Sequence, residues 1–335
     1  MEKVKTLVRK DPHLTRLFLI FALVTVVMGA LRPETFLSAD NFRSMAVQFP
    51  ELGFLSIAAA LVLMSGGIDL SVTGTAVLSG IVAALIMRDG LAAGGNPVML
   101  VVVAIVAALI VGTVCGAMNA FLVAKLDINP MLATLGTSNF FTGVGVVLTK
   151  GSAISGFPEQ FMVIGNGYVL GIPVPLILFI IAIVVLGFFL TKTKLGYKLH
   201  VYGTNPIASF FSAIHNTKVV FSTYLVSGIV SSIAGIIMLS RINTAKADFG
   251  SSYGLQALLV AVLGGVNPSG GGGKAVGIFM AIVTLQFLSS GFNLLHVSSF
   301  MKDFAWGALL VIIMVMNVVQ PKLKKKKDAK KAEKE

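Results

Sequence analysis

Ten apolar runs, separated by short polar or glycine-rich segments, constrain this chain more than any other feature. All but one hold about 17 residues or more, close to the ~20 that a helix needs to cross a bilayer. Backbone groups in lipid have to be satisfied within the segment, which favours helices. The sequence therefore predicts an all-α polytopic membrane protein with about ten transmembrane helices. The runs are roughly 14–31, 45–64, 71–87, 98–124, 130–148, 174–191, 219–240, 254–266, 275–292 and 303–319.

The composition agrees with a chain solvated mostly by lipid. Charged residues make up 12% of it, about half of what soluble domains carry, and 56% of the residues are hydrophobic. The net charge of +12 resides at the two ends and in one central loop, so we expect contact with membrane lipid and none with nucleic acid. Cys115, the only cysteine, lies inside an apolar run and is expected to fill space.

Charge placement predicts the orientation. The first run follows a basic start and is too long for a typical signal-peptide core, so we interpret it as an uncleaved helix. If every run crosses, nineteen Lys and Arg fall on the side of the N-terminus and seven on the other. This bias predicts that both termini are cytoplasmic. We divide the chain into an N-terminal segment (1–13), a transmembrane domain (14–319) and a basic cytoplasmic tail (320–335), which we expect to be disordered and attracted to anionic lipid.

A glycine-rich stretch, Met64 to Gly74, interrupts the apolar runs. Irregular backbone at membrane depth is tolerated where protein or a watery cavity covers it. The stretch has an internal echo, because residues 61–69 resemble residues 259–267. Paired breaks in two halves of a membrane protein indicate broken helices beside a central path. Asp69 either shapes this path or caps a helix that begins at Leu70.

The loop at about 192–218 predicts a short helix. Asn205 is a suitable N-cap and Pro206 suits the first helical position. The apolar positions that follow have the spacing of a single helix face. Such a face either lies on the bilayer or docks into a groove on a cytoplasmic partner. Its members are Ile207, Phe210, Phe211 and Ile214.

No catalytic, nucleotide or metal motif stands out. The cluster 270–273 followed by Lys274 fails as a phosphate loop, since Pro268 and Ala275 stand where glycine and Ser or Thr are needed. The four histidines lack metal-ligand spacing. We therefore expect no enzyme activity, cofactor or metal in this chain. Asp69 is the only acid that we place beside the run interiors, which weakens the reading as an ion-coupled carrier.

These residues resemble the ribose-type permease subunits of bacterial ABC importers. The family hallmark is similar to G-G-I-D-L-S-V-G, which Gly66 to Val72 reproduces, with Thr73 where glycine is usual. The similarity extends over about 40–318. Two other parts resemble the family: 133–143, with Thr142 where arginine is usual, and the glycine-rich segments 263–273 and 291–295.

The resemblance implies roles for three groups of residues. The central loop would be the segment that couples to the ATPase, with Ile207 and Ala213 departing from the family pattern. Its residues are Gly203, Asn205, Pro206, Ala208, Phe210, Phe211, Ser212 and Ile214. The translocation path would be shaped by Gly66, Gly67, Asp69, Ser71, Gly264, Gly265 and Asn293.

The third group is an outer mouth formed by Lys246, Gln256 and Lys302. With Gly254, these residues make it more positive than is usual in the family. We hypothesise that it suits an anionic or strongly polar solute, or an acidic face of a binding protein, because a charged funnel attracts counter-charge. Neutral drift at a wet rim is the alternative.

The resemblance further implies a subunit, in the bacterial inner membrane, that moves a monosaccharide or similar solute inward. ATP would be hydrolysed by a cytoplasmic subunit, solute delivered by an extracytoplasmic binding protein, and the path formed with a second permease copy, identical or related. The alternatives are an ABC permease for an autoinducer-type furanosyl compound, a nucleoside or a branched-chain amino acid, and an ion-coupled secondary carrier.

Overall fold

The structure, a computed structural model, describes residues 12–332 of the chain. Nine of the described helices are long and apolar enough to cross a membrane, so the predicted all-α class is confirmed. They are α2 (Pro12–Leu31), α4 (Ala39–Met64), α5 (Val72–Ala92), α6 (Pro97–Ala124), α7 (Pro130–Thr149), α9 (Val174–Lys192), α12 (Asn216–Ile242), α14 (Ala275–Leu294) and α15 (Ser299–Ala332).

Short elements fill the ends of this bundle. The segment between α7 and α9 contains one helix and three of the two-residue strands. The strands form two antiparallel pairs, β1–β4 and β2–β3. The short elements are α3 (Pro33–Phe36), α8 (Glu159–Asn166), α10 (Lys194–Thr204), α11 (Pro206–Phe211), α13 (Tyr253–Leu263), β1 (Ile154–Ser155), β2 (Tyr168–Val169), β3 (Ile172–Pro173) and β4 (Thr244–Ala245).

The predicted span at 254–266 is wrong as a full helix. α13 has 11 residues, about 16 Å at 1.5 Å per residue, whereas the apolar core of a bilayer is about 30 Å thick. The chain between the end of α12 and the start of α13 contains no helix; it consists of β4 and turns. By its length, α13 therefore covers only about half of a crossing.

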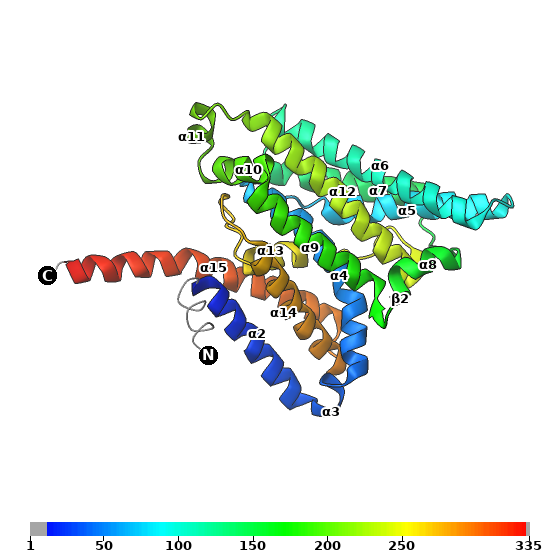
Figure 1. The fold of residues 1–335 in the computed structure, drawn as a ribbon, viewed down its shortest axis with the longest axis horizontal. Helices are drawn as coiled ribbons and strands as arrows, with labels where there is room; N and C mark the ends of the chain where they lie inside the picture. Colours follow the sequence, from blue (N-terminus) through cyan, green and yellow to red (C-terminus); the bar gives the residue numbers. More distant parts are fainter. Residues whose placement is uncertain (1–11, 333–335) are drawn as a thin grey trace.

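The bundle has two ends, which Figure 1 shows at the upper left and the lower right. We call the end that carries α10 and α11 the α10 face, and the end that carries α3, α8 and β2 the α8 face. Successive spans cross in opposite directions, so the segments that connect them fall alternately on the two sides. The segments 65–70, 192–218 and 264–274 fall on one side, and they are in contact at the α10 face. The segments 150–173 and 241–252 fall on the other, where β1 pairs with β4.

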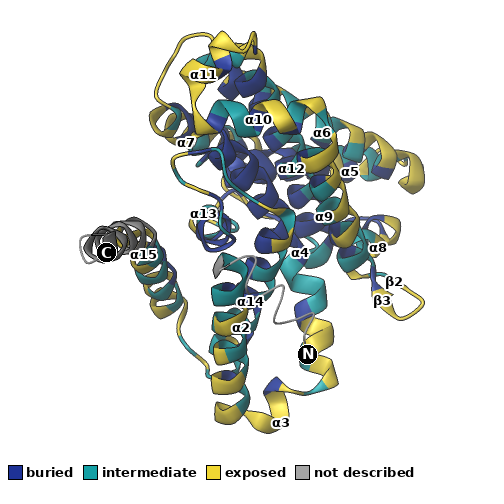
Figure 2. Ribbon diagram, turned by 60° about the vertical axis from the view of Figure 1, so that its left-hand side comes forward, coloured by how far each residue is buried: buried dark blue, intermediate teal, exposed yellow. Residues whose placement is uncertain are grey.

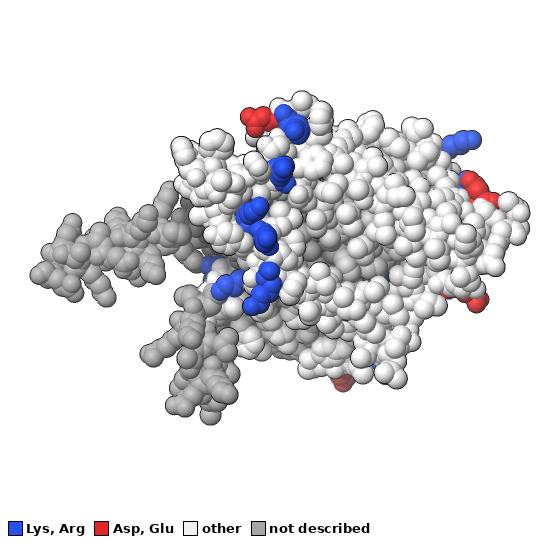
Figure 3. All heavy atoms as spheres, turned by 45° about the horizontal axis from the view of Figure 1, so that its top comes forward, with Lys and Arg blue, Asp and Glu red and all other residues white. Residues whose placement is uncertain are grey.

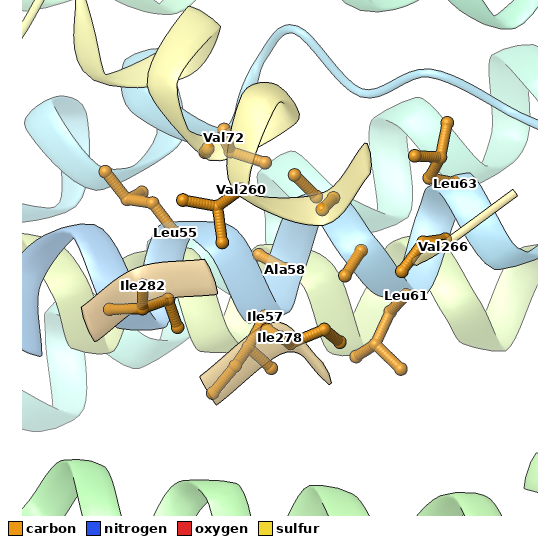
Figure 4. Packing of buried hydrophobic residues seen from close by; sticks show 14 of the residues in the cluster. Leu55, Ile57, Ala58, Leu61, Leu63, Val72, Val260, Val266, Ile278 and Ile282 are labelled. Atoms are coloured by element: carbon orange, nitrogen blue, oxygen red, sulfur yellow. The ribbon is translucent and has the colours of Figure 1, made fainter. Parts of the chain in front are cut away.

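The core is built around α4, α12 and α13. Every residue of α4 from Pro50 to Met64 is buried, and Figure 2 shows the dark blue of buried residues concentrated where these three helices meet. In Figure 4, Leu55 and Leu61 of α4 lie beside Val260 of α13 and Ile278 of α14. By contrast α6 and α9, which are almost wholly apolar, expose many side chains outward. Apolar helices on the outside are what lipid as solvent permits.

Small residues bring α6 and α12 together. A methyl group added at Gly112 would lie 2.6 Å from the Gly228 carbonyl oxygen, and one at Gly116 would lie 2.7 Å from the Tyr224 carbonyl oxygen. The backbones of the two helices therefore approach closely at these glycines, as is typical of small residues in membrane helices.

The C-terminal tail differs from the expected disorder. α15 continues as helix through Ala332. Lysine and alanine, which dominate the tail, are strong helix formers, and they extend a helix already nucleated by the preceding span. Residues 1–11 of the expected N-terminal segment lie outside the described part of the chain.

Candidate functional site

The first break separates α4 from α5 and contains four of the predicted path residues. α4 ends at Met64, and Gly66 turns the chain with φ +80°, a conformation that favours glycine. Gly67 approaches Tyr224 of α12 so closely that a methyl group there would lie 2.8 Å from its hydroxyl oxygen. The break is thus covered by protein, as expected for irregular backbone in a membrane protein.

The second break separates α13 from α14. Gly265 turns the chain with φ +89°. Gly264 packs against the first turns of α14, where a methyl group added to it would lie 2.9 Å from the Ile278 backbone. The two glycines therefore have different roles: Gly265 forms a turn, and Gly264 allows a close approach to α14.

The two breaks meet each other. The Gly271 amide donates a hydrogen bond of 2.9 Å to the Met64 carbonyl oxygen. Gly66 lies against the backbone of Ser269 and Gly270. A methyl group added to Gly66 would lie 3.6 Å from the Ser269 carbonyl oxygen. The internal echo seen in the sequence thus corresponds to two glycine-rich segments in direct contact.

α10 lies directly on this junction. A methyl group at Gly203 would lie 2.0 Å from the Met64 carbonyl oxygen and 2.4 Å from the Gly271 nitrogen, so only glycine allows this approach. The Nδ1 atom of His200 is 3.0 Å from the Gly271 carbonyl oxygen, within hydrogen-bond distance. The predicted coupling segment and the predicted path breaks are therefore joined through α10, which the sequence did not single out as a helix.

α11 follows α10 and has the predicted start. The Asn205 side chain accepts hydrogen bonds from the amides of Ile207 and Ala208, both at 3.0 Å, and Pro206 is the first helical residue. The helix ends at Phe211, although the predicted apolar face extends to Ile214. It ends there because Ala213 adopts the left-handed conformation with φ +58°.

The apolar face of α11 is consequently shorter than expected. Ile207, Phe210 and Phe211 are 71%, 69% and 81% exposed, whereas Ile214 is buried against the body of the protein. Of the other predicted coupling residues, Ser212 caps the end of α11 and Ala208 is exposed on it. Three large exposed side chains on six residues form an apolar knob at the α10 face.

Asp69 lies at the centre of a buried polar network. Its Oδ1 accepts from the Ser71 amide at 2.9 Å and the Ser71 hydroxyl at 2.6 Å, and its Oδ2 accepts from Ser227 of α12 at 2.9 Å. Asn119 of α6 donates to the Ser71 hydroxyl at 2.7 Å and accepts from Thr137 of α7 at 2.6 Å. Since α5 begins only at Val72, Asp69 both orders the turn before that helix and ties the break to three other helices.

A second threonine of α7 fixes the same break. The Thr134 hydroxyl donates to the Ile68 carbonyl oxygen at 3.0 Å and accepts from the Leu70 amide at 3.1 Å. Sequence reasoning missed Thr134, Asn119 and Ser227. The available signal was their polarity inside apolar runs, where side chains that cannot reach water need a partner.

The predicted outer mouth is only partly assembled. Gln256, Lys302 and the path residue Asn293 line one polar cavity of about 320 Å³ near the α8 face. Lys246 lies elsewhere, in the loop before α13, and its ammonium group is 2.9 Å from the Asp248 carboxylate. This hydrogen-bonded lysine lowers the pKa of Asp248 below its ordinary value. The structure therefore separates Lys246 from the other two residues.

The sequence-based predictions also missed an acidic residue, Glu51, inside an apolar run. Glu51 lies within α4, is fully buried, and pairs with Arg241 at the end of α12 through a short charge-assisted hydrogen bond. Tyr253 of α13 lies 3.5 Å from the other carboxylate oxygen. The prediction that Asp69 is the only such acid is wrong. Because Arg241 balances its charge, Glu51 joins α4, α12 and α13 rather than standing free for a coupling ion.

The fold and this site define a polytopic membrane permease, with glycine-broken helices joined through α10 to the exposed apolar helix α11. The family described as branched-chain amino acid transport system / permease component matches residues 41–314, and the chain belongs to it. It is 35% identical over 302 residues to the ribose import permease protein RbsC of Bacillus subtilis (strain 168), covering 90% of this chain and 91% of the relative.

A second relative is the autoinducer 2 import system permease protein LsrD of Escherichia coli (strain K12). It is 31% identical over 296 residues, which is 87% of each chain. The predicted family resemblance is thus confirmed over almost the whole transmembrane domain. No solved structure matches the chain.

Proposed function

We propose that this chain is the membrane-spanning subunit of a binding-protein-dependent ABC importer that moves a monosaccharide, ribose-like or related, inward. A separate ATP-binding subunit would hydrolyse ATP, and this chain itself would catalyse no reaction. The observation that carries the proposal is the contact between α10 and both helix breaks, next to the exposed knob of α11.

The knob on α11 suits a protein partner. Removing a Phe or Ile side chain from water contributes about 1.5–3 kcal/mol, so three such side chains on one short helix favour docking over exposure. Asn205 and Pro206 fix the start of this helix, and four residues join its end at Phe211 to α12. A push on α11 would reach the breaks through α10, because the linker between these two helices is the single residue Asn205.

The orientation follows from charge. Figure 3 shows a band of Lys and Arg at one end of the molecule and a broad white area across its middle. An excess of basic residues marks the cytoplasmic side, so we assign the α10 face and both termini to the cytoplasm. The basic tail would then meet anionic lipid of the inner leaflet of a bacterial inner membrane. The α8 face would receive solute from an extracytoplasmic binding protein.

The path requires a second permease copy, identical or related, in this proposal. The relatives support two solute classes: RbsC is a ribose import permease and LsrD an autoinducer 2 import permease. An autoinducer-type furanosyl compound is therefore the second candidate. Branched-chain amino acids follow from the family description alone. Glu51 does not support the hypothesis of a secondary carrier, because its charge is paired with that of Arg241.

The test uses the assembled complex of this chain with its ATP-binding subunit and binding protein. Replacing Phe210 and Phe211 with Asp should abolish solute-stimulated ATP turnover and weaken copurification of the ATP-binding subunit. Leu170→Asp is the matched control for copurification of the ATP-binding subunit, since Leu170 is 97% exposed and lies at the opposite face. Copurification that is weakened by neither change, or equally by both, contradicts the proposed docking role of α11.

A further inference from the structure

One cavity of the described chain differs from the others in its lining. It has a volume of about 320 Å³ and opens near the α8 face, between α4, α13, α14 and α15. Ligand pockets have volumes of about 300–1,000 Å³, so it can hold a small solute. Most of its wall is polar, whereas a groove of similar size between α4, α9 and α12 is almost purely apolar.

The polar groups are amides and hydroxyls rather than a set of like charges. Gln48, Gln256, Gln286 and Asn293 contribute side-chain amides, and serines of three segments contribute hydroxyl groups. Amides donate and accept hydrogen bonds at once, as do the hydroxyls of a sugar. The lining therefore suits a solute with many hydroxyl groups.

Gln286 is one of the buried members. Its side chain is 7% exposed and lines the cavity. Because a buried polar group without a partner is costly, an amide placed here favours hydrogen bonds to water or to a solute in the cavity. Gln286 lies on α14, one helix turn beyond Ile282 of the core.

Charge in the cavity is balanced. Lys302 donates to the Asn293 side-chain oxygen, and the carboxylate of Asp303 lines the same cavity. One cation and one anion leave no net charge to attract an anionic solute. With Lys246 placed elsewhere, the hypothesis of a positive mouth loses its structural support.

Trp306 supplies a flat apolar wall. It is 4% exposed and packs against Phe292 with ring centroids 5.7 Å apart. An indole among amides matches a sugar ring, which combines apolar C–H faces with a rim of hydroxyls. Leu52 of α4 adds a second apolar contact.

We propose that this cavity is a receiving site within a single permease chain for a neutral polyhydroxylated ring, with Gln286 and Trp306 as its principal contacts. The inference rests on the proposed import function and adds the substrate chemistry and its residues. It replaces the anionic solute considered from the sequence with an uncharged one.

The experiment uses Trp306 as its own reporter, because it is the only tryptophan in the chain. The full-length chain in lipid nanodiscs is titrated with D-ribose, D-glucose and D-gluconate while tryptophan emission is recorded. We expect a saturable change with at least one neutral sugar and a weaker response to gluconate. Gln286→Leu should raise the half-saturating sugar concentration about tenfold, the size expected for one lost buried hydrogen bond.

Two controls make the result decisive. Gln160→Leu changes an exposed glutamine of α8 and should titrate like the unmodified chain. Should Gln286→Leu shift the emission maximum before any sugar is added, Gln48→Leu takes its place. An unchanged titration in these cavity variants, or tighter binding of gluconate than of the sugars, overturns the receiving site.

The receiving site and the proposed function fail separately. If Trp306 does not respond to a sugar that the complete complex imports with ATP, the site is wrong and the function stands. If Trp306 responds but ATP drives no uptake by the complete complex, the site stands and the function is wrong.

Discussion

The amide of Gly271 and the carbonyl oxygen of Met64, 2.9 Å apart, join the two broken helices of this permease at one point. Gly203 of α10 touches both partners of this bond, and no larger residue fits there. A displacement of α10 therefore has to move the end of α4 and the segment before α14 together. This junction gives the proposed coupling a physical route.

Gly203→Ala tests that route. Its methyl group would overlap the Met64 carbonyl oxygen and the Gly271 nitrogen, so α10 has to move away from the breaks. We expect solute-stimulated ATP turnover by the assembled complex to fall at least tenfold, while the ATP-binding subunit still copurifies through α11. Gly136→Ala is the control, because a methyl group there meets open space. Full activity of Gly203→Ala would show that the junction carries no coupling.

The buried Asp69 network predicts different costs for two serines of α12. Ser227 and Ser231 are both fully buried, but only Ser227 donates to Asp69, and the Ser231 hydroxyl has no partner among the described residues. Ser227→Ala should destabilise the chain by about 1–3 kcal/mol, because it leaves a carboxylate oxygen unsatisfied. Ser231→Ala should be neutral or stabilising. Equal shifts in the thermal unfolding midpoints of the two variants in nanodiscs would contradict the network.

Much of this fold could be predicted from the sequence, because a helix that crosses lipid needs a long apolar run. Apolar runs long enough to cross predicted nine of the long helices. This rule failed at 254–266, since hydropathy does not distinguish a full crossing from a half-length helix such as α13. It also hid Glu51, whose charge is acceptable in α4 only because Arg241 reaches it from a distant part of the sequence.

The site was predicted only where local patterns set it. Asn205 and Pro206 specify the start of α11 through adjacent backbone groups, and glycine pairs mark the breaks. The contact of α10 with both breaks and the bonds of Asp69 to Ser227 depend on residues far apart in the chain, which no local spacing reveals.

Ala213 offers a stabilising substitution. Its φ of +58° lies in the left-handed region, where a side chain costs roughly 1 kcal/mol relative to glycine. Ala213→Gly should therefore raise stability by about 1 kcal/mol. The same change at Ala208, inside α11, should lower stability by about 0.5–1 kcal/mol, because glycine weakens helices. Thermal unfolding of both variants checks the opposite signs, and a lower midpoint for Ala213→Gly would disprove the conformational argument.

Removing one partner of the buried Glu51–Arg241 pair should destabilise the chain far more than removing one partner of a surface pair. Arg241→Met leaves the buried Glu51 without its partner and should cost about 3–5 kcal/mol. Arg88→Met removes the exposed partner of Asp89 and should leave the unfolding midpoint nearly unchanged, because water screens that pair. Replacing Glu51 and Arg241 together by Met should recover most of the loss. Unfolding midpoints rank the three variants, and a double variant as unstable as Arg241→Met would contradict a pairing role.

The central claim is that this chain is a scaffold driven from its α10 face by another subunit. The most direct measurement is uptake of radiolabelled D-ribose into proteoliposomes that hold ATP, with the binding protein outside. We predict uptake when this chain is reconstituted with its ATP-binding subunit, and none with the chain alone or when Phe210 and Phe211 are both Asp. Ribose accumulation by the chain alone, driven by a proton or sodium gradient, would contradict the account.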